Sequence, residues 1–161
     1  MIIKNNIVEM LESYDKDCVY LAVSMIRNSH ELKEYDKLLT KISLFDRIRN
    51  YSDVCKELSI NELTEIDFRY FPIEQRLKML SFYRIQNITK LFNQDWILNW
   101  SDIKQRKYYP WFEKKSSGWV CCGSVVYFSG SGSVVGLFKS EEISDFCGKL
   151  FLEDYINIIE N

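Results

Sequence analysis

Residues 107–138 read KYYPWFEKKSSGWVCCGSVVYFSGSGSVVGLF, and this stretch decides the fold class. It contains short runs of aromatic and β-branched residues that are separated by serine and glycine. Such runs are typical of strands joined by tight turns, so an antiparallel meander of about three strands is expected. The predicted strands occupy residues 109–114, 119–128 and 134–138.

Serine and glycine at 116–118 and 129–132 are predicted to form the turns of this meander. The tetrapeptide Gly-Ser-Val-Val occurs at 123–126 and again at 132–135, which indicates a hairpin with similar arms. The amides of the glycines around the second turn could cradle a phosphate. Their spacing is not that of a P-loop and they do not join a strand to a helix, so a hairpin turn is the favoured interpretation.

Residues 1–93 repeat apolar side chains at three- and four-residue spacing, which predicts helices. Polar caps and a proline divide this part into segments, because they favour the first turn of a helix. Four helices are expected here. The first begins after Asp15, and the second begins after Ser29 and stops near Asn50. The third occupies residues 52–58, and the fourth runs from Pro72 to about Phe92. Residues 95–102 are expected to form an irregular connection anchored by two tryptophans.

One final helix is predicted from the cap Ser140, with Glu141 and Glu142 near the positive end of its dipole. Its apolar face consists of Ile143, Phe146, Cys147, Leu150, Phe151, Tyr155 and Ile158. Together the segments predict one α+β domain over residues 1–161, with N-terminal helices, a small antiparallel sheet and a C-terminal packing helix. Residues 1–55 would be a helical N-terminal extension, and residues 56–161 the α+β module.

The composition narrows the class of protein. The 21 basic and 23 acidic residues give a net charge of -2, which argues against a protein that coats duplex nucleic acid. No apolar run approaches about 18 residues, so no membrane partner is expected. Residues 1–6 lack the pattern of a signal peptide, and the five cysteines are odd in number, so a cytoplasmic protein with reduced thiols is expected.

The sequence contains no evident catalytic or metal-binding set. Its one histidine, His30, is remote in the sequence from Cys121, Cys122 and Cys147. No Cys-x-x-Cys and no histidine pair offers metal ligands, and neighbouring carboxylates on a helix point in different directions. We therefore expect a protein that is not an enzyme and that uses no metal and no cofactor.

All four tryptophans lie between residues 96 and 119, among several lysines and an arginine. Flat rings can stack on planar groups and cations can hold phosphate, so this aromatic-basic region is the candidate binding surface. Its candidate residues are Trp96, Trp100, Lys104, Arg106, Lys107, Tyr108, Tyr109, Trp111, Lys114 and Lys115. The opposing interpretation is that Trp96, Trp100, Trp111 and Phe112 are core residues between a helical layer and a small sheet. If Trp111 faces inward, strand alternation turns Phe112 outward.

Several segments in the C-terminal two-thirds of the chain carry a family resemblance. They are LSINEL at 58–63, NQDW at 93–96, NWSD at 99–102, KYYPWF at 107–112, VGLFKSEE at 135–142 and FCGKLF at 146–151. Over residues 55–159 the chain resembles a family of small uncharacterised proteins of bacteriophages, prophages and mobile elements of gut anaerobes. The resemblance implies an accessory protein that binds host or viral macromolecules, and it brings no assigned activity.

The leading hypothesis is a phage-type accessory protein that acts as a non-enzymatic binding module, through the aromatic-basic region, for a protein or nucleic-acid partner. A protein partner is favoured, and the compartment would be the cytoplasm of the host cell. An alternative is a protein that binds a nucleotide or another small ligand between a ring and the glycine-serine loop. A further alternative is a structural virion or oligomeric component whose N-terminal helices assemble.

Overall fold

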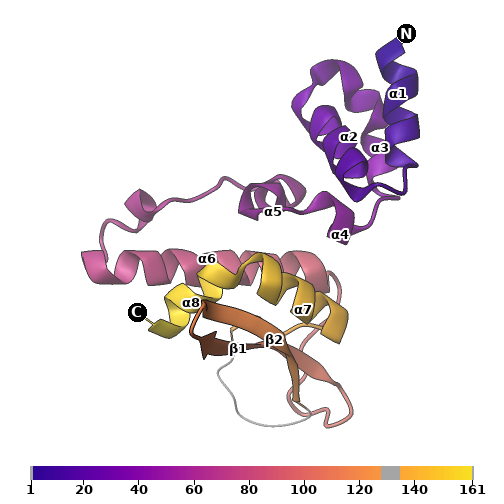
Figure 1. The fold of residues 1–161 in the computed structure, drawn as a ribbon. Helices are drawn as coiled ribbons and strands as arrows, with labels where there is room; N and C mark the ends of the chain where they lie inside the picture. Colours follow the sequence, from indigo (N-terminus) through magenta and orange to yellow (C-terminus); the bar gives the residue numbers. More distant parts are fainter. Residues whose placement is uncertain (1, 128–134, 161) are drawn as a thin grey trace. The chain divides into compact units, whose positions relative to one another are not determined.

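The computed structural model describes residues 2–127 and 135–160 and contains both helices and strands. The chain divides into two compact units, Met1–Arg49 and Asn50–Asn161. In Figure 1 the first unit is indigo to purple, and the second continues through magenta to yellow. The predicted boundary between residues 55 and 56 cuts through helix α5 (Tyr51–Leu58). This helix packs on α6 (Ile73–Asn93), which belongs to the second unit.

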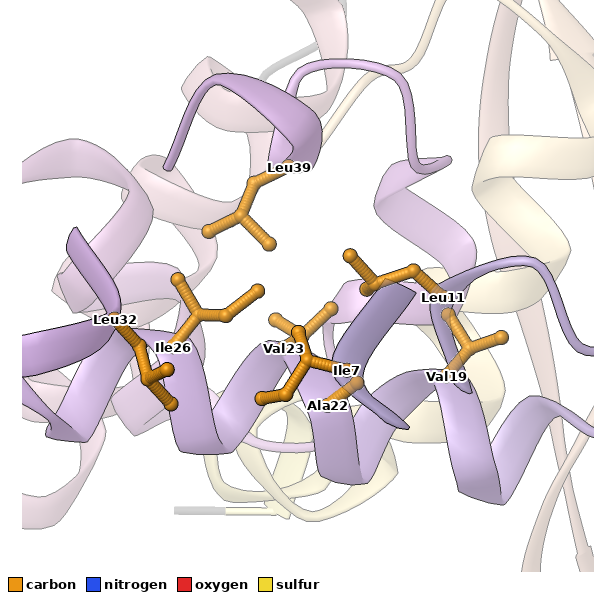
Figure 2. Packing of buried hydrophobic residues seen from close by; sticks show 8 residues of the cluster. All are labelled: Ile7, Leu11, Val19, Ala22, Val23, Ile26, Leu32 and Leu39. Atoms are coloured by element: carbon orange, nitrogen blue, oxygen red, sulfur yellow. The ribbon is translucent and has the colours of Figure 1, made fainter. Parts of the chain in front are cut away.

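The first unit is entirely helical within the described residues. It contains α1 (Ile2–Leu11), α2 (Lys16–Asn28), the 3₁₀ helix η1 (His30–Tyr35), α3 (Asp36–Leu39) and α4 (Leu44–Arg47). Figure 2 shows apolar side chains of α1, α2, η1 and α3 pointing toward one another. The cluster is formed by Ile7, Leu11, Val19, Ala22, Val23, Ile26, Leu32 and Leu39, all buried. This small core explains how so short a segment forms a unit of its own.

The predicted caps of the first unit have mixed outcomes. Asp15 caps α2 as predicted, because its carboxylate accepts a hydrogen bond from the Asp17 amide at 2.9 Å. The predicted single helix after Ser29 is wrong, since the chain forms η1 and α3 and then stops. Thr40 donates to the Lys37 carbonyl at 2.8 Å, and Ser43 accepts from the Phe45 amide to start α4. Side chains such as Thr40 and Ser43 bond to backbone groups that would otherwise continue a helix, so the chain after Ser29 forms several short helices.

The second unit is built around α6. Its other elements are α5, η2 (Glu65–Phe68), β1 (Lys107–Lys115), β2 (Gly118–Tyr127), α7 (Glu141–Leu150) and α8 (Leu152–Glu160). Asn50, expected to end a helix, instead caps α5 by accepting from the Asp53 amide at 3.1 Å. The long helix predicted from Pro72 is confirmed. Helix α7 packs on both strands and α8 packs on α6 and β2, so these two helices connect α6 to the sheet (Figure 1).

The two strands form an antiparallel hairpin with one irregularity. Lys115 pairs with Gly118 across the predicted first turn, and Gly118 has a φ of 113°, which glycine tolerates. The register shifts between Trp111 and Phe112, which pair with Gly123 and Cys121, so that Cys122 is an extra residue in a β-bulge. The bulge turns Cys121 and Ser124 to the same face, toward α7.

The predicted third strand is wrong, because the sheet has two strands within residues 2–127 and 135–160. Phe138 makes a single bridge to Tyr108, with backbone bonds of 2.8 and 2.9 Å, rather than pairing with β2. On its other side the segment is bonded by a side chain. Buried Asn93 donates to the Leu137 carbonyl at 2.7 Å and accepts from the Lys139 amide at 3.1 Å. Asn93 therefore takes the place that a neighbouring strand would have. The predicted turn at 129–132 lies outside the described residues.

The single predicted C-terminal helix is two helices. Ser140 caps α7 as predicted, since its hydroxyl accepts from the Ile143 amide at 3.3 Å. The helix ends at Leu150, and Phe151 leaves helical geometry with φ -111° and ψ 30° before α8 begins. The break gives each helix its own packing partners: α7 packs on both strands, and α8 packs mainly on α6. Phe151, at the break, and Tyr155, in α8, are both buried.

Candidate functional site

The segment between α6 and β1 exposes three apolar side chains of the aromatic-basic region. Ile97 is 81% exposed, Ile103 is 66% exposed and Trp100 is 36% exposed. Lys104 and Arg106 are exposed beside them. We call these five residues the loop surface. Trp96, at the start of the segment, is half-buried, so the structure separates it from the exposed tip.

Lys107 determines the shape of this loop. Its side chain is completely buried, and its ammonium donates to the carbonyls of Gln105 at 2.8 Å and Asp102 at 3.2 Å. The same ammonium lies 5.7 Å from the centre of the Trp100 ring. These contacts offset the loss of hydration that burial of a cation requires. The expectation that Lys107 faces outward as a binding cation is therefore wrong, because its charge organises the loop from inside.

Polar side chains complete the loop from within. The side-chain Nε2 of Gln105 donates to the Ile97 carbonyl at 2.8 Å, and its side-chain Oε1 accepts from the backbone N–H of Asn99 at 2.7 Å. The Asp102 carboxylate accepts from the Lys104 amide at 2.8 Å, in an Asx-turn. The backbone of the loop is thus bonded to its own side chains. These hydrogen bonds fix the backbone conformation in which Ile97, Trp100 and Ile103 are exposed to solvent.

The strand residues of the region divide between core and surface. Pro110 faces α7, where a Cβ on Gly148 would come within 2.5 Å of it, and Phe112 is 9% exposed. Trp111 is 50% exposed and points the other way, which follows from strand alternation. Lys115 is also exposed. The core interpretation thus holds for Phe112 and does not hold for Trp111.

Tyr108 and Tyr109 are half-buried and belong to the packing of the second unit. The Tyr109 ring meets Tyr155 edge-on at 6.1 Å and Phe112 edge-on at 6.4 Å between ring centres. Edge-to-face pairs of this kind add to the stability that ring burial provides. Tyr108 makes the backbone bridge to Phe138. Tyr109 is therefore a core residue rather than an open stacking platform.

Lys114 joins the hairpin to α8. Its ammonium lies 2.7 Å from the Glu160 carboxylate, and the Trp119 indole N–H donates to the same oxygen at 2.8 Å. Hydrogen bonds from Lys114 and Trp119 lower the pKa of Glu160. Because the pair is exposed, its contribution to stability is small. Its main effect here is that the Lys114 charge is already neutralised.

A polar cluster that the sequence did not reveal lies among α5, α6 and α8. Arg84 lies 3.6 Å from Asp154 and 3.7 Å from Glu62, and its guanidinium is 4.9 Å from the centre of the Tyr51 ring. Burial raises the pKa of Asp154, although the Arg84 charge opposes the shift. The signal in the sequence was weak: a buried serine, Ser81, interrupts the apolar stripe of α6.

The turn before α6 also exposes apolar residues that the sequence analysis did not single out. Tyr70 is 86% exposed, Ile73 is 74% exposed and Ile66 is 73% exposed. Arg76 of α6 bonds the turn to the helix, because its guanidinium donates to the carbonyls of Arg69 at 2.9 Å and Phe71 at 3.0 Å. An open groove of about 630 Å³ follows along α6, lined by Glu74, Gln75, Lys78, Met79, Phe82 and Ile158.

Several chemical features bear on catalysis and metals. Burial raises the pKa of the Cys55, Cys121 and Cys147 thiols, which disfavours reactive thiolates. Within residues 2–127 and 135–160, no group of three or more His, Cys, Asp or Glu side chains could hold a metal ion. In the same part of the chain, every helix is too short or too polar to cross a membrane.

Comparison of the chain with protein families, with curated proteins and with solved structures found no match.

Proposed function

We propose that this protein is a non-enzymatic binding module that holds a protein partner with its loop surface. The observation that carries the proposal is the buried Lys107 ammonium, which bonds the loop backbone and leaves Ile97, Trp100 and Ile103 in the solvent. A loop held in one conformation loses little entropy on binding. The surface combines tryptophan and arginine, the residue types that dominate binding energy at protein interfaces.

A protein partner fits this surface better than a nucleic acid. Stacking on bases needs open ring faces, and the Lys107 ammonium lies over the Trp100 ring. Neutralising phosphates needs several accessible cations, but Lys107 is buried and Lys114 is paired with Glu160. Lys104 and Arg106 are exposed in the same loop as Ile97 and Ile103. A partner with an apolar centre and an acidic rim is complementary to this arrangement.

The sequence resemblance supports a biological setting for the proposal. Proteins of bacteriophages and mobile elements commonly act on macromolecules of the cell that carries them. We therefore place the binding event in the host cytoplasm, as an accessory function.

The proposal is tested with a double charge reversal, Lys104→Glu with Arg106→Glu. Lys107 is left unchanged because it is buried and shapes the loop. Proteins captured from a host-cell lysate by the wild-type chain should be at least about tenfold depleted with the variant, because rim charges and buried hot spots act together. Quantitative mass spectrometry of the captured material gives the measurement.

A matched control separates the loop from general charge effects. Lys56→Glu with Lys90→Glu makes the same change in net charge at exposed positions of α5 and α6. This control should capture the same proteins as the wild type. Equal capture by the loop variant would overturn the proposal. Loop-dependent binding of a single-stranded oligonucleotide, with no captured protein, would replace the protein partner with a nucleic acid.

A further inference from the structure

Strand β2 (Gly118–Tyr127) is paired along one edge, where β1 bonds to it. Along the opposite edge, the part of the chain that the structure describes places no further strand. Nor does a backbone group of any other described element bond to β2. The Cys121 and Cys122 thiols reach β2 carbonyls at 3.7 and 3.9 Å, but both thiols belong to β2 itself. We call the backbone N–H and C=O groups of β2 that point away from β1 the open edge.

The open edge has a chemistry that one kind of ligand satisfies. A strand turns its backbone groups alternately toward one neighbour and the other, so about half of those of β2 point away from β1. Unpaired donors and acceptors at this spacing are a template for a further strand. An extended peptide segment carries donors and acceptors with the same repeat, so the ligand that matches the open edge is a strand.

Strand β2 lacks the side chains that usually protect a sheet edge. Lysine and other charges, proline and bulges keep foreign strands away from edges. β2 reads GWVCCGSVVY and contains no charge and no proline, whereas β1 contains Pro110 and a run of charges at 113–115. The bulge at Cys122 divides β2, but residues 123–127 continue without a further shift of register. This stretch alone has the length of a typical strand.

The outer face of the hairpin indicates which side chains an added strand would carry. Trp111 is 50% exposed and pairs with Gly123, where a Cβ would meet nothing within 4 Å. A strand added to β2 would lie about 10 Å from β1, so its side chains can meet a large ring across a glycine. Val126 is also exposed, at 39%. Apolar and β-branched side chains pair favourably with such neighbours, and a charge placed there would lose hydration without a partner on β2.

We infer that the open edge of β2 binds an extended, uncharged segment of a protein partner, which becomes the third strand of the sheet. Backbone hydrogen bonds would supply the affinity, and contacts with Trp111 and Val126 would supply the selectivity. This site goes beyond the proposed function, because it uses the hairpin and none of the five residues of the loop surface.

Amide hydrogen exchange followed by NMR, in the presence of a reductant, tests whether the edge is open. In the free chain at low concentration, the amides on the open edge should exchange at least about tenfold faster than the β2 amides that bond to β1. Equal protection of all β2 amides would overturn the inference, because the edge would already be covered. Protection that appears only as protein concentration rises would replace the partner with a second copy of the chain.

A synthetic peptide tests the ligand. The probe is the heptapeptide Thr-Val-Thr-Val-Thr-Val-Thr with blocked ends, which is uncharged and favours an extended backbone. It should slow exchange at the open edge. Lys-Val-Lys-Val-Lys-Val-Lys should bind at least about tenfold more weakly because of its charges. Thr-Pro-Thr-Pro-Thr-Pro-Thr should not bind, because proline has no N–H to donate. No protection by the first peptide, or equal protection by all three, would overturn the inference.

Paired lysine variants locate the peptide on β2. Cys122→Lys with Val126→Lys places charges at two exposed positions of the strand and should weaken binding of the threonine–valine peptide at least about tenfold. Ser116→Lys with Ser117→Lys makes the same change in charge at exposed positions of the turn and should bind like the wild type. Circular dichroism checks that both variants are folded. Equal binding by the two variants would overturn the inference.

The loop variant separates this site from the proposed function. Lys104→Glu with Arg106→Glu leaves β2 unchanged, so it should bind the threonine–valine peptide like the wild type. Loss of peptide binding in this variant would place the peptide on the loop and overturn the inference. Failure of the peptide experiments leaves the proposed function intact, since that function is decided by proteins captured through the loop.

Discussion

At the scale of single residues, Arg84 connects three helices of the second unit. Its guanidinium lies near the Asp154 and Glu62 carboxylates and over the Tyr51 ring. Asn157 donates to the hydroxyl of buried Ser81 in the same region, at 3.2 Å. The loss of hydration disfavours the charged form of Asp154 more than the attraction of Arg84 favours it, because burial is the largest effect on this carboxyl and raises its pKa. The main role of the cluster is therefore to select which side chains pack together, and its contribution to the free energy of unfolding is small.

The raised pKa of Asp154 predicts how stability depends on pH. A raised pKa means that the folded chain binds a proton more tightly than the unfolded chain, whose carboxyl titrates near 3.8. The contribution of this group to the free energy of unfolding is therefore largest at low pH, and it falls as pH rises from about 3.8 through the folded pKa. Urea unfolding between about pH 3 and pH 7 gives the measurement.

Asp154→Asn is the control for this prediction. The variant cannot titrate at this position, so subtracting its unfolding free energy from that of the wild type isolates Asp154. The difference should decline toward neutral pH. Glu160, whose pKa is lowered by Lys114 and Trp119, titrates in both proteins and cancels. A difference that rises with pH would show that the Arg84 charge outweighs burial.

At the scale of elements, the packing of α7 on the hairpin depends on close approach. Gly148 faces the sheet, where an added Cβ would lie 2.5 Å from the Pro110 Cβ and 2.8 Å from the Cys121 sulfur. The β-bulge at Cys122 brings Cys121 and Ser124 to this face, and Ser124 hydrogen-bonds to Asp145 of α7. The glycine and the bulge together let a helix and two strands share one interface.

Gly148→Ala is predicted to separate α7 from the sheet. Alanine is the better helix former by roughly 1 kcal/mol, so local propensity alone would stabilise the variant. The contacts with Pro110 and Cys121 should outweigh this gain and lower the free energy of unfolding by about 1–3 kcal/mol. Urea denaturation followed by tryptophan fluorescence measures the change.

Lys149→Ala is the comparison, because Lys149 is the next residue of α7 and is exposed. Lys149→Ala should change the free energy of unfolding by no more than about 0.5 kcal/mol. If Gly148→Ala proves as stable as Lys149→Ala, the close approach of α7 to Pro110 is not a feature of the protein.

At the scale of the whole molecule, the chain consists of two compact units with separate cores. The first has a small aliphatic core, and the second has an aromatic core in which Tyr109, Phe112 and Tyr155 meet. The loop surface belongs to the second unit, Asn50–Asn161. The proposed binding should therefore need only that unit.

The boundary between the units can be tested with two truncations. A fragment of residues 50–161 should unfold cooperatively, because α5 keeps its contacts with α6. A fragment of residues 56–161 should be less stable by about 3 kcal/mol or more, since it loses Tyr51 and Val54, which are 6% and 0% exposed. Urea midpoints by circular dichroism compare them. Equal midpoints would place the boundary within α5 instead.

The sequence by itself determined the features that depend on near neighbours. Asp15 and Ser140 cap the helices they were predicted to cap, the long helix follows Pro72, and the first turn of the hairpin lies where serine and glycine predict it. Each of these signals acts within a few residues, through a cap, a fixed φ or strand alternation. Such signals can be read from the chain directly.

Only the tertiary structure decided the features that depend on segments meeting across the fold. The predicted third strand is a single bridge because Asn93, far away in the sequence, bonds the backbone at Leu137 and Lys139. Lys107 is buried because the preceding loop offers its ammonium two carbonyls and the Trp100 ring. No local pattern contains these partners. A lysine or an asparagine is placed by the acceptors and donors that the fold brings to it, and the loop surface follows from that placement.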